Sequence, residues 1–165
     1  MNPEKTVAFT GHRPEKIRDG QDENSVSVLH IKFQLRQAIL EMIDKGCTCF
    51  LSGMAMGTDL WAAEIVLDLK KQYPYLRLAA VIPFPGQSNL FSKEWKHRYL
   101  DILSRCDESH IITPQRQSNS FMLRNKWLVD HAAHVIGVYH GGRSGTMQTL
   151  NMALLNGSDV KIIHC

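Results

Sequence analysis

The feature that most constrains the fold is the segment 49–64, where a short apolar run is followed by a glycine-containing turn and a helical pattern. The residues from Cys47 to Leu51 favour a buried strand, and apolar residues from Ala62 to Leu69 recur at helical spacing. We expect Thr58 or Asp59 to cap the helix. The segment therefore predicts one strand-turn-helix unit of an α/β protein.

The turn itself is typical of an anion-binding loop. Gly53 and Gly57 lie between the strand and the helix, with no bulky β-branched residue beside them. Glycine lets backbone N–H groups approach a ligand closely, and the positive end of the helix dipole attracts negative charge. Phosphate is the ligand that such a turn suits.

Two further strands also run into glycine. Val135–Tyr139 is followed by a glycine-rich loop at 140–146 and by an apolar helix, and Val7–Thr10 runs into the segment 11–14. The carboxyl ends of parallel strands share one edge of a sheet. We therefore expect the three loops to converge on one crevice.

Strands and helices alternate along the whole chain. The expected strands are Thr6–Thr10, Cys47–Leu51, Arg77–Ile82, Ser109–Thr113, Val135–Tyr139 and Val160–His164. The expected helices are Ser27–Lys45, Asp59 to just before Tyr73, Ser88–Leu103, Ser118–His131 and a last one ending at Leu155. This alternation predicts an α/β fold, doubly wound, with a mostly parallel sheet and helices on both faces. No linker or repeat divides residues 1–165, which we interpret as one domain.

Composition narrows the function without identifying it. The chain is 44% hydrophobic and 21% charged, with a formal charge of +3, which is typical of a globular protein. This charge allows a phosphorylated ligand but does not indicate a nucleic-acid-binding surface. The four cysteines lack the spacing of a zinc site, and we expect Cys47 and Cys49 to be buried thiols on one face of a strand. With no apolar leader or membrane-length run, a cytoplasmic protein is expected.

The glycine-containing loops do not match two familiar nucleotide-binding motifs, which disfavours a P-loop nucleoside triphosphatase and a standard dinucleotide-binding dehydrogenase. No Lys-Ser or Lys-Thr follows Gly142, so the second glycine loop is not a P-loop, and no G-x-G-x-x-G follows the first strand. The second loop still offers backbone donors and two hydroxyls at a helix start, and Arg143 or Arg13 is placed to neutralise a phosphate.

Three side chains have alternative interpretations. Trp61 either stacks on a base or sugar or is partly buried against a helix, with Asp59 or Glu64 accepting bonds from ribose hydroxyls in the first case. Asp59 as a helix cap is compatible with ligand contact. His12 is either a general acid or base, or a histidine that bonds the backbone.

Taken together, these motifs resemble the YpsA-like branch of the SLOG superfamily. The resemblance rests on Thr10–Pro14, on Ser52–Asp59 with Trp61–Glu64, and on Gly141–Thr146. It extends to Pro83, Phe84 and Gln87 after the third strand, and to Arg124, Asn125, Trp127 and Asp130. The resemblance implies a Rossmann-like domain that binds an ADP-ribose-like or nucleotide-sugar-like ligand as a sensor or regulatory module. The implied ligand contacts are Gly11, His12, Arg13, Ser52, Gly53, Met54, Ala55, Gly57, Asp59, Trp61, Glu64, Pro83, Phe84, Gln87, Asn125, Gly141, Gly142, Arg143, Ser144, Gly145 and Thr146.

Two related families supply alternatives. LOG-type phosphoribohydrolases carry a glutamate after a similar Gly-Thr, whereas residues 145–149 here contain no carboxylate. If this chain hydrolyses an N-glycosidic bond, the candidates are Glu64, Asp59 and His12. DprA-like proteins bind single-stranded DNA, but the absence of a basic run argues against a nucleic-acid partner. We expect a small nucleotide-derived ligand, no metal, no resident cofactor, no membrane partner, and self-association as the relatives suggest.

Overall fold

The computed structural model describes all 165 residues and contains one six-stranded sheet in which every neighbouring pair is parallel. The strands are β1 (Thr6–Gly11), β2 (Cys49–Ser52), β3 (Arg77–Ile82), β4 (Glu108–Ile111), β5 (His134–Tyr139) and β6 (Asp159–His164). The helices are α1 (Val26–Asp44), α2 (Thr58–Leu69), α3 (Lys93–Arg105), α4 (Ser120–His131) and α5 (Gly145–Leu155). Short 3-10 helices occupy Pro3–Lys5, Pro14–Lys16 and Gln87–Leu90.

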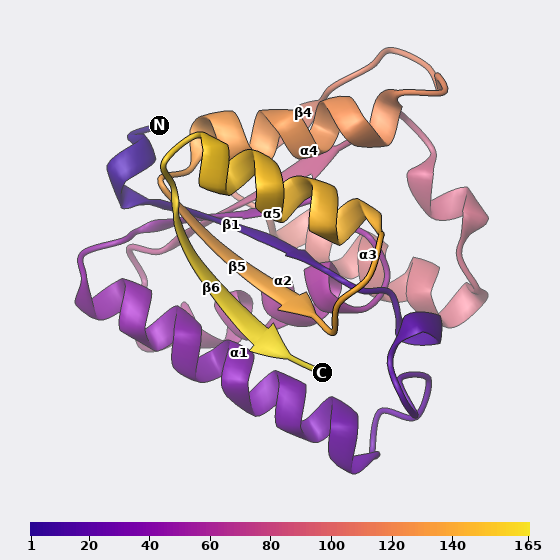
Figure 1. Cartoon of the computed structure of the whole chain (residues 1–165), viewed down its shortest axis with the longest axis horizontal. Helices are drawn as coiled ribbons and strands as arrows, with labels where there is room; N and C mark the ends of the chain where they lie inside the picture. The colour runs from indigo at the N-terminus through magenta and orange to yellow at the C-terminus, as the bar shows by residue number, and fades with distance from the viewer.

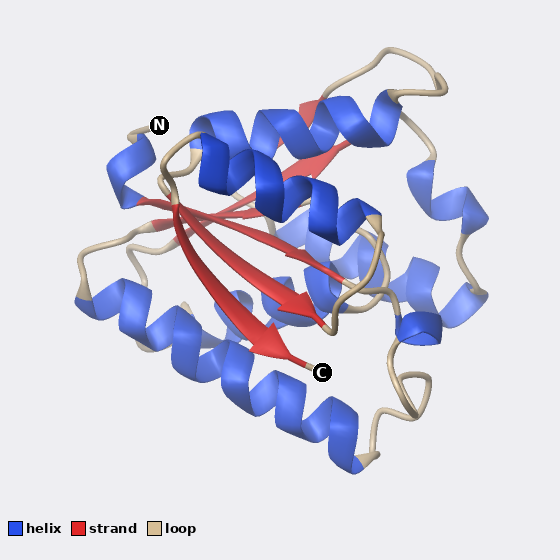
Figure 2. Cartoon of the chain, viewed as in Figure 1, coloured by secondary structure: helices blue, strands red, loops and turns tan.

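Helices cover both faces of the sheet, as predicted (Figures 1 and 2). Helices α1, α2 and α3 lie on one face, where 29 buried residues form the larger apolar cluster. Helices α4 and α5 lie on the other face over a cluster of 11. The α/β, Rossmann-like, doubly wound class is therefore confirmed, and the sheet is wholly rather than mostly parallel.

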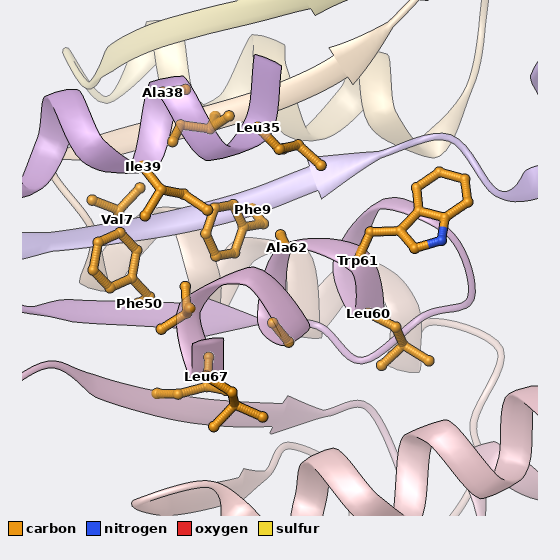
Figure 3. Packing of buried hydrophobic residues seen from close by; sticks show 14 of the residues in the cluster. Val7, Phe9, Leu35, Ala38, Ile39, Phe50, Leu60, Trp61, Ala62 and Leu67 are labelled. Atoms are coloured by element: carbon orange, nitrogen blue, oxygen red, sulfur yellow. The ribbon is translucent and has the colours of Figure 1, made fainter. Parts of the chain in front are cut away.

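The larger cluster joins the sheet to α1 and α2. Phe9 of β1 and Phe50 of β2 stack with their ring centroids 6.0 Å apart. Leu35 and Ile39 of α1 reach them from the helix above, and Trp61 of α2 closes the end of the cluster (Figure 3). This packing holds the first two strands, and therefore the loops that follow them, in a fixed relation.

The strand order β4-β3-β2-β1-β5-β6 reverses direction at β1. From β1 the chain builds outward through β2, β3 and β4, and then returns to place β5 on the other side of β1. The loops after β1 and β5 thus leave the same sheet edge and diverge, which in doubly wound folds opens a crevice for ligands.

The starts of two helices differ from the sequence predictions. Helix α2 is capped by Gly57, at φ 86°, and not by Thr58 or Asp59, because both side chains bond elsewhere. The helix expected at 88–103 is interrupted before Ser92, whose Oγ accepts a bond from the Trp95 N–H and starts α3.

The two early cysteines are both buried but do not share a face. Cys47 belongs to the larger cluster and Cys49 to the smaller one. The reason is that Cys47 precedes β2 and its N–H still bonds the Met42 carbonyl of α1, so the alternation of a strand does not yet apply. No helix in the chain combines the length and apolar character needed to cross a membrane.

Candidate functional site

A pocket of about 310 Å³ opens at the carboxyl edge of the sheet, between the loops that follow β1 and β5. Its walls come from four parts of the chain that are distant in sequence. They are Phe9, Thr10, Gly11, His12, Arg13, Glu15 and Lys16; Ala55 and Asp59; Phe121, Arg124, Asn125 and Leu128 of α4; and Ser144, Gly145 and Thr146 at the start of α5.

The first turn of α5 contributes backbone donors to this pocket. The Ser144 side chain caps the helix by accepting a bond from the Met147 N–H at 3.1 Å. The Gln148 N–H bonds the Ser144 carbonyl, so the N–H groups of Gly145 and Thr146 are the ones without an intrahelical acceptor. Both residues line the pocket, which gives it the positive end of a helix dipole.

Arg124 is a buried arginine in the wall of the pocket. It is 5% exposed, its Nε donates to Asn125 Oδ1 at 2.7 Å, and its Nη1 donates to the Gly53 carbonyl. The arginines that form ion pairs within 4.0 Å are Arg36, Arg98 and Arg105, and Arg124 is not among them. Arg124 is therefore a buried cation whose bonds go to neutral acceptors only.

Two further cations and two carboxylates line the pocket with Arg124, and one of the carboxylates is Glu15, an exposed residue beside Lys16. Arg13 and Lys16 are exposed residues of the loop after β1. Asp59 is 6% exposed, and its Oδ2 accepts a bond from the Ala55 N–H at 3.2 Å. Burial raises the pKa of Asp59, and the charge of Arg124 opposes that rise. Burial also lowers the pKa of Arg124.

His12 is a neutral member of the pocket wall. It is 2% exposed, and its Nε2 accepts a bond from the His140 N–H at 3.3 Å. Burial, and then the nearby His140 and Lys16, lower the pKa of His12 to about 4. Because Nε2 is an acceptor, the hydrogen-bond network assigns the proton to Nδ1.

The loop after β2 shapes the pocket from behind. Ser52 Oγ donates to the Asp59 carbonyl at 3.0 Å and accepts from the Met54 N–H at 3.2 Å. This holds Met54 at φ 61°, a conformation that side-chain-bearing residues seldom adopt. A Cβ on Gly53 would lie 2.7 Å from Arg124 Nη1 and 2.8 Å from Asp59 Oδ2, so only glycine allows both charged groups to approach. Gly57 similarly admits Pro14, whose Cδ would lie 2.8 Å from an added Cβ.

The stripe of Trp61 and Glu64, expected to address a sugar or base, lies outside the pocket lining. Trp61 is 1% exposed, and its Nε1 donates to a Glu23 oxygen at 3.0 Å. Glu64 pairs with Arg98 Nη2 at 2.5 Å, and Arg98 Nη1 lies 3.1 Å from Glu23. Of the two interpretations of Trp61, the structure therefore favours burial.

Two other predicted groups also lie outside the lining. Pro83, Phe84 and Gln87 are buried behind the pocket, where the Phe84 ring meets Phe121 edge-on at 5.5 Å. Gly141, Gly142 and Arg143 form a loop beside it, and Tyr139 donates to the Gly142 carbonyl at 2.6 Å. The predicted residues that do line the pocket are Gly11, His12, Arg13, Ala55, Asp59, Asn125, Ser144, Gly145 and Thr146.

The sequence analysis assigns no ligand contact to Lys16, Phe121 or Arg124, although Arg124 is among the residues that carry the family resemblance. Lys16 lies in a 3-10 turn that begins at Pro14 and folds back toward the strand end. Phe121, Arg124 and Leu128 follow the three- and four-residue spacing of one face of α4. That spacing was a usable signal, but nothing in the sequence showed that this face meets the loop after β1.

Comparison with known proteins agrees with this architecture. The sequence model of the YspA SLOG family (YpsA) matches residues 7–161. A UPF0398 protein of Halalkalibacterium halodurans is 29% identical over 144 residues, which cover 86% of this chain and 76% of that protein. A UPF0398 protein of Bacillus pumilus is 26% identical over 163 residues, which cover 97% of this chain and 87% of that protein.

Among solved structures, DNA processing protein A (DprA) from Streptococcus pneumoniae is similar, with a TM-score of 0.65 and 21% identity over 96% of this chain. DprA from Helicobacter pylori, a protein described with a single-stranded DNA binding mode, gives a TM-score of 0.65 and 19% identity over 98% of this chain. The chain spans 50% and 65% of those two proteins. At these identities the similarity shows a shared fold.

Proposed function

This chain belongs to the YspA SLOG family, and from that premise we propose that its pocket binds a phosphate-bearing, nucleotide-derived small molecule such as ADP-ribose or a nucleotide sugar. In this role the protein acts as a sensor or regulatory module, with the bound state as its signal.

Arg124 carries the proposal. A buried charge without a directly bonded partner of opposite charge is costly, and a buried guanidinium is normally matched by a carboxylate or a phosphate in hydrogen-bond contact. The Asp59 carboxyl group interacts with Arg124 electrostatically but lies beyond 4.0 Å, and Arg124 lines an open pocket with Arg13, Lys16 and the first turn of α5. A phosphate group placed there is bound by the cations and by the N–H groups of Gly145 and Thr146.

The rest of the ligand has partners of other kinds. Asp59 accepts hydrogen bonds from sugar hydroxyls, and neutral His12 donates one from Nδ1. Phe121 takes the place first considered for Trp61, because its half-buried ring lines the pocket. The guanidinium carbons of Arg13 and Arg124 each lie 5.8 Å from its centroid.

Calorimetric titration tests this proposal with AMP, ADP-ribose, ribose 5-phosphate and a single-stranded oligonucleotide as probes. We expect one of the phosphorylated small molecules to bind, with affinity that falls as salt is added. Lys16→Ala weakens that binding about tenfold, the loss of one charge-assisted contact. Arg18→Ala is the matched control, since Arg18 is also an exposed cation of the same loop and lies outside the pocket.

The proposal is wrong if none of the small molecules binds, or if the two variants behave alike. If only the oligonucleotide bound, the ligand of the pocket would be a nucleic acid and not a small molecule.

A second candidate, hydrolysis of an N-glycosidic bond, rests on Asp59. This carboxyl group is buried in the wall of the pocket that holds the anion-binding groups, whereas Glu64 is paired with Arg98. In that reaction water adds to the anomeric carbon, the base leaves with a proton, and Asp59 stabilises the positive charge that develops on the sugar. Release of adenine from AMP that disappears in Asp59→Asn, with AMP binding retained, would support it.

A further inference from the structure

Gln87 occupies a buried position directly behind Arg124. It lies in the 3-10 helix after β3, is 2% exposed, and does not line the pocket. Its Nε2 donates to the Gly53 carbonyl at 3.2 Å. The opposite orientation of the amide would set its oxygen against that carbonyl oxygen, so the network fixes Nε2 as the donor.

The Gly53 carbonyl is an acceptor shared by Gln87 and Arg124. Arg124 Nη1 donates to the same oxygen, and Arg124 Nε is held by Asn125. The guanidinium is planar, so bonds at Nε and Nη1 fix its orientation toward the pocket. Any movement of the Gly53 carbonyl therefore turns the guanidinium plane.

The other end of the Gln87 amide is unsatisfied. Gln87 Oε1 is buried and has no hydrogen-bond partner. Leaving a buried polar atom unpaired costs stability, and an apolar side chain of the same size would avoid that cost. The one hydrogen bond that the amide makes is the bond to the Gly53 carbonyl, so that bond is what an amide supplies at this position.

We propose that Gln87 is a positioning residue, which fixes the Gly53 carbonyl and through it the guanidinium of Arg124 for an incoming phosphate. The inference rests on the proposed function of the pocket. It also changes the role that the family resemblance implied for Gln87, from a ligand contact to a group that acts through the backbone.

The test compares Gln87→Met with Ser88→Ala in the full-length protein. Met keeps the length of the side chain while removing both the donor and the unpaired oxygen. Ser88 is the adjacent residue, is 5% exposed and lies outside the pocket. Three properties are measured: AMP affinity by calorimetry, thermal midpoint, and hydrogen exchange of the Arg124 Nε–H by NMR in the ligand-free protein.

We expect Gln87→Met to weaken AMP binding about tenfold and to speed exchange of the Arg124 Nε–H, while the thermal midpoint stays equal or rises. Ser88→Ala leaves AMP affinity and Arg124 exchange at their wild-type values. This combination distinguishes positioning from a structural role, which would lower the midpoint.

Unchanged exchange at Arg124 in Gln87→Met overturns the inference, whatever happens to AMP affinity. If the wild-type protein binds no AMP, the result counts against AMP as the ligand and against the proposed function. The exchange rate of the Arg124 Nε–H then still shows whether Gln87 orients the guanidinium. Unchanged AMP affinity in Gln87→Met, with the wild type binding, overturns the inference and leaves the proposed function standing.

Discussion

At the scale of single residues, the pocket contains three titratable side chains that are buried away from water. His12 is neutral and buried, Asp59 is a buried carboxyl group, and Arg124 is a buried cation with no carboxylate within 4.0 Å, although the charge of Asp59 acts on it from beyond that distance. Such arrangements cost folding stability and are concentrated at binding and catalytic sites. The distribution of these three residues around one pocket is therefore itself an argument for function.

His12 gives a prediction for pH dependence. Its pKa is lowered from 6.5 to about 4 in the folded protein. Between these values the unfolded chain binds a proton that the folded chain does not, so His12 makes stability fall as pH falls through this window. Each unit of pKa difference corresponds to about 1.4 kcal/mol.

Urea denaturation of the wild type and of His12→Asn between pH 4 and 7 measures this contribution. We expect the free energy of unfolding to fall less steeply on acidification in the variant. Parallel curves would contradict the assignment of a neutral, buried His12.

Sequence reasoning found the site residues that lie next to a strand end. Gly11 ends β1, His12 and Arg13 follow it directly, and Gly145 and Thr146 begin the helix after β5, so chain connectivity alone places them. It could not place Arg124 or Phe121, because their contact with the pocket depends on how α4 lies across the sheet. Trp61 was ambiguous because a helix stripe gives no sign of which neighbour covers it.

At the scale of elements, the first turn of α5 has two roles, because some of its N–H groups are capped within the helix and others face the pocket. The Ser144 cap satisfies the Met147 N–H and leaves the N–H groups of Gly145 and Thr146 for the pocket. The strand-glycine-helix pattern predicted this arrangement. The same pattern at Ser52–Asp59 predicts a second phosphate loop, but there the Ser52 and Asp59 side chains accept bonds from N–H groups of their own loop, and Thr58 Oγ1 donates to the His12 carbonyl of the loop after β1.

Removing the cap tests the element directly. Ser144→Ala is expected to cost about 1 kcal/mol of stability and also to weaken AMP binding, because the first turn loosens. Ser92→Ala removes the corresponding cap of α3, at Trp95 N, away from the pocket. Denaturation and calorimetry on both variants should show a stability loss in each and an affinity loss only in Ser144→Ala. Equal AMP affinity in the two variants would show that the first turn of α5 does not contribute to the binding site.

At the scale of the whole molecule, the strand order explains why distant segments form one pocket. The reversal at β1 brings the loop after β1 beside the loop after β5, although about 130 residues of chain separate them. Alternating strands and helices predicted a parallel sheet with two helical layers, but not the position of this reversal. The modest charge of +3 likewise does not reveal that Arg13, Lys16 and Arg124 gather at one edge, together with the carboxyl groups of Glu15 and Asp59.

The central claim is that this edge binds a phosphorylated, nucleotide-derived ligand. Titration of the ¹⁵N-labelled protein with AMP, followed by NMR, tests it most directly. The account predicts saturable shifts of the backbone signals of Gly145 and Thr146 and of the Arg124 Nε–H, with no shift of the Trp61 indole signal. Shifts centred on Trp61 and Glu64, or saturable binding that leaves Gly145 and Arg124 unmoved, would contradict it.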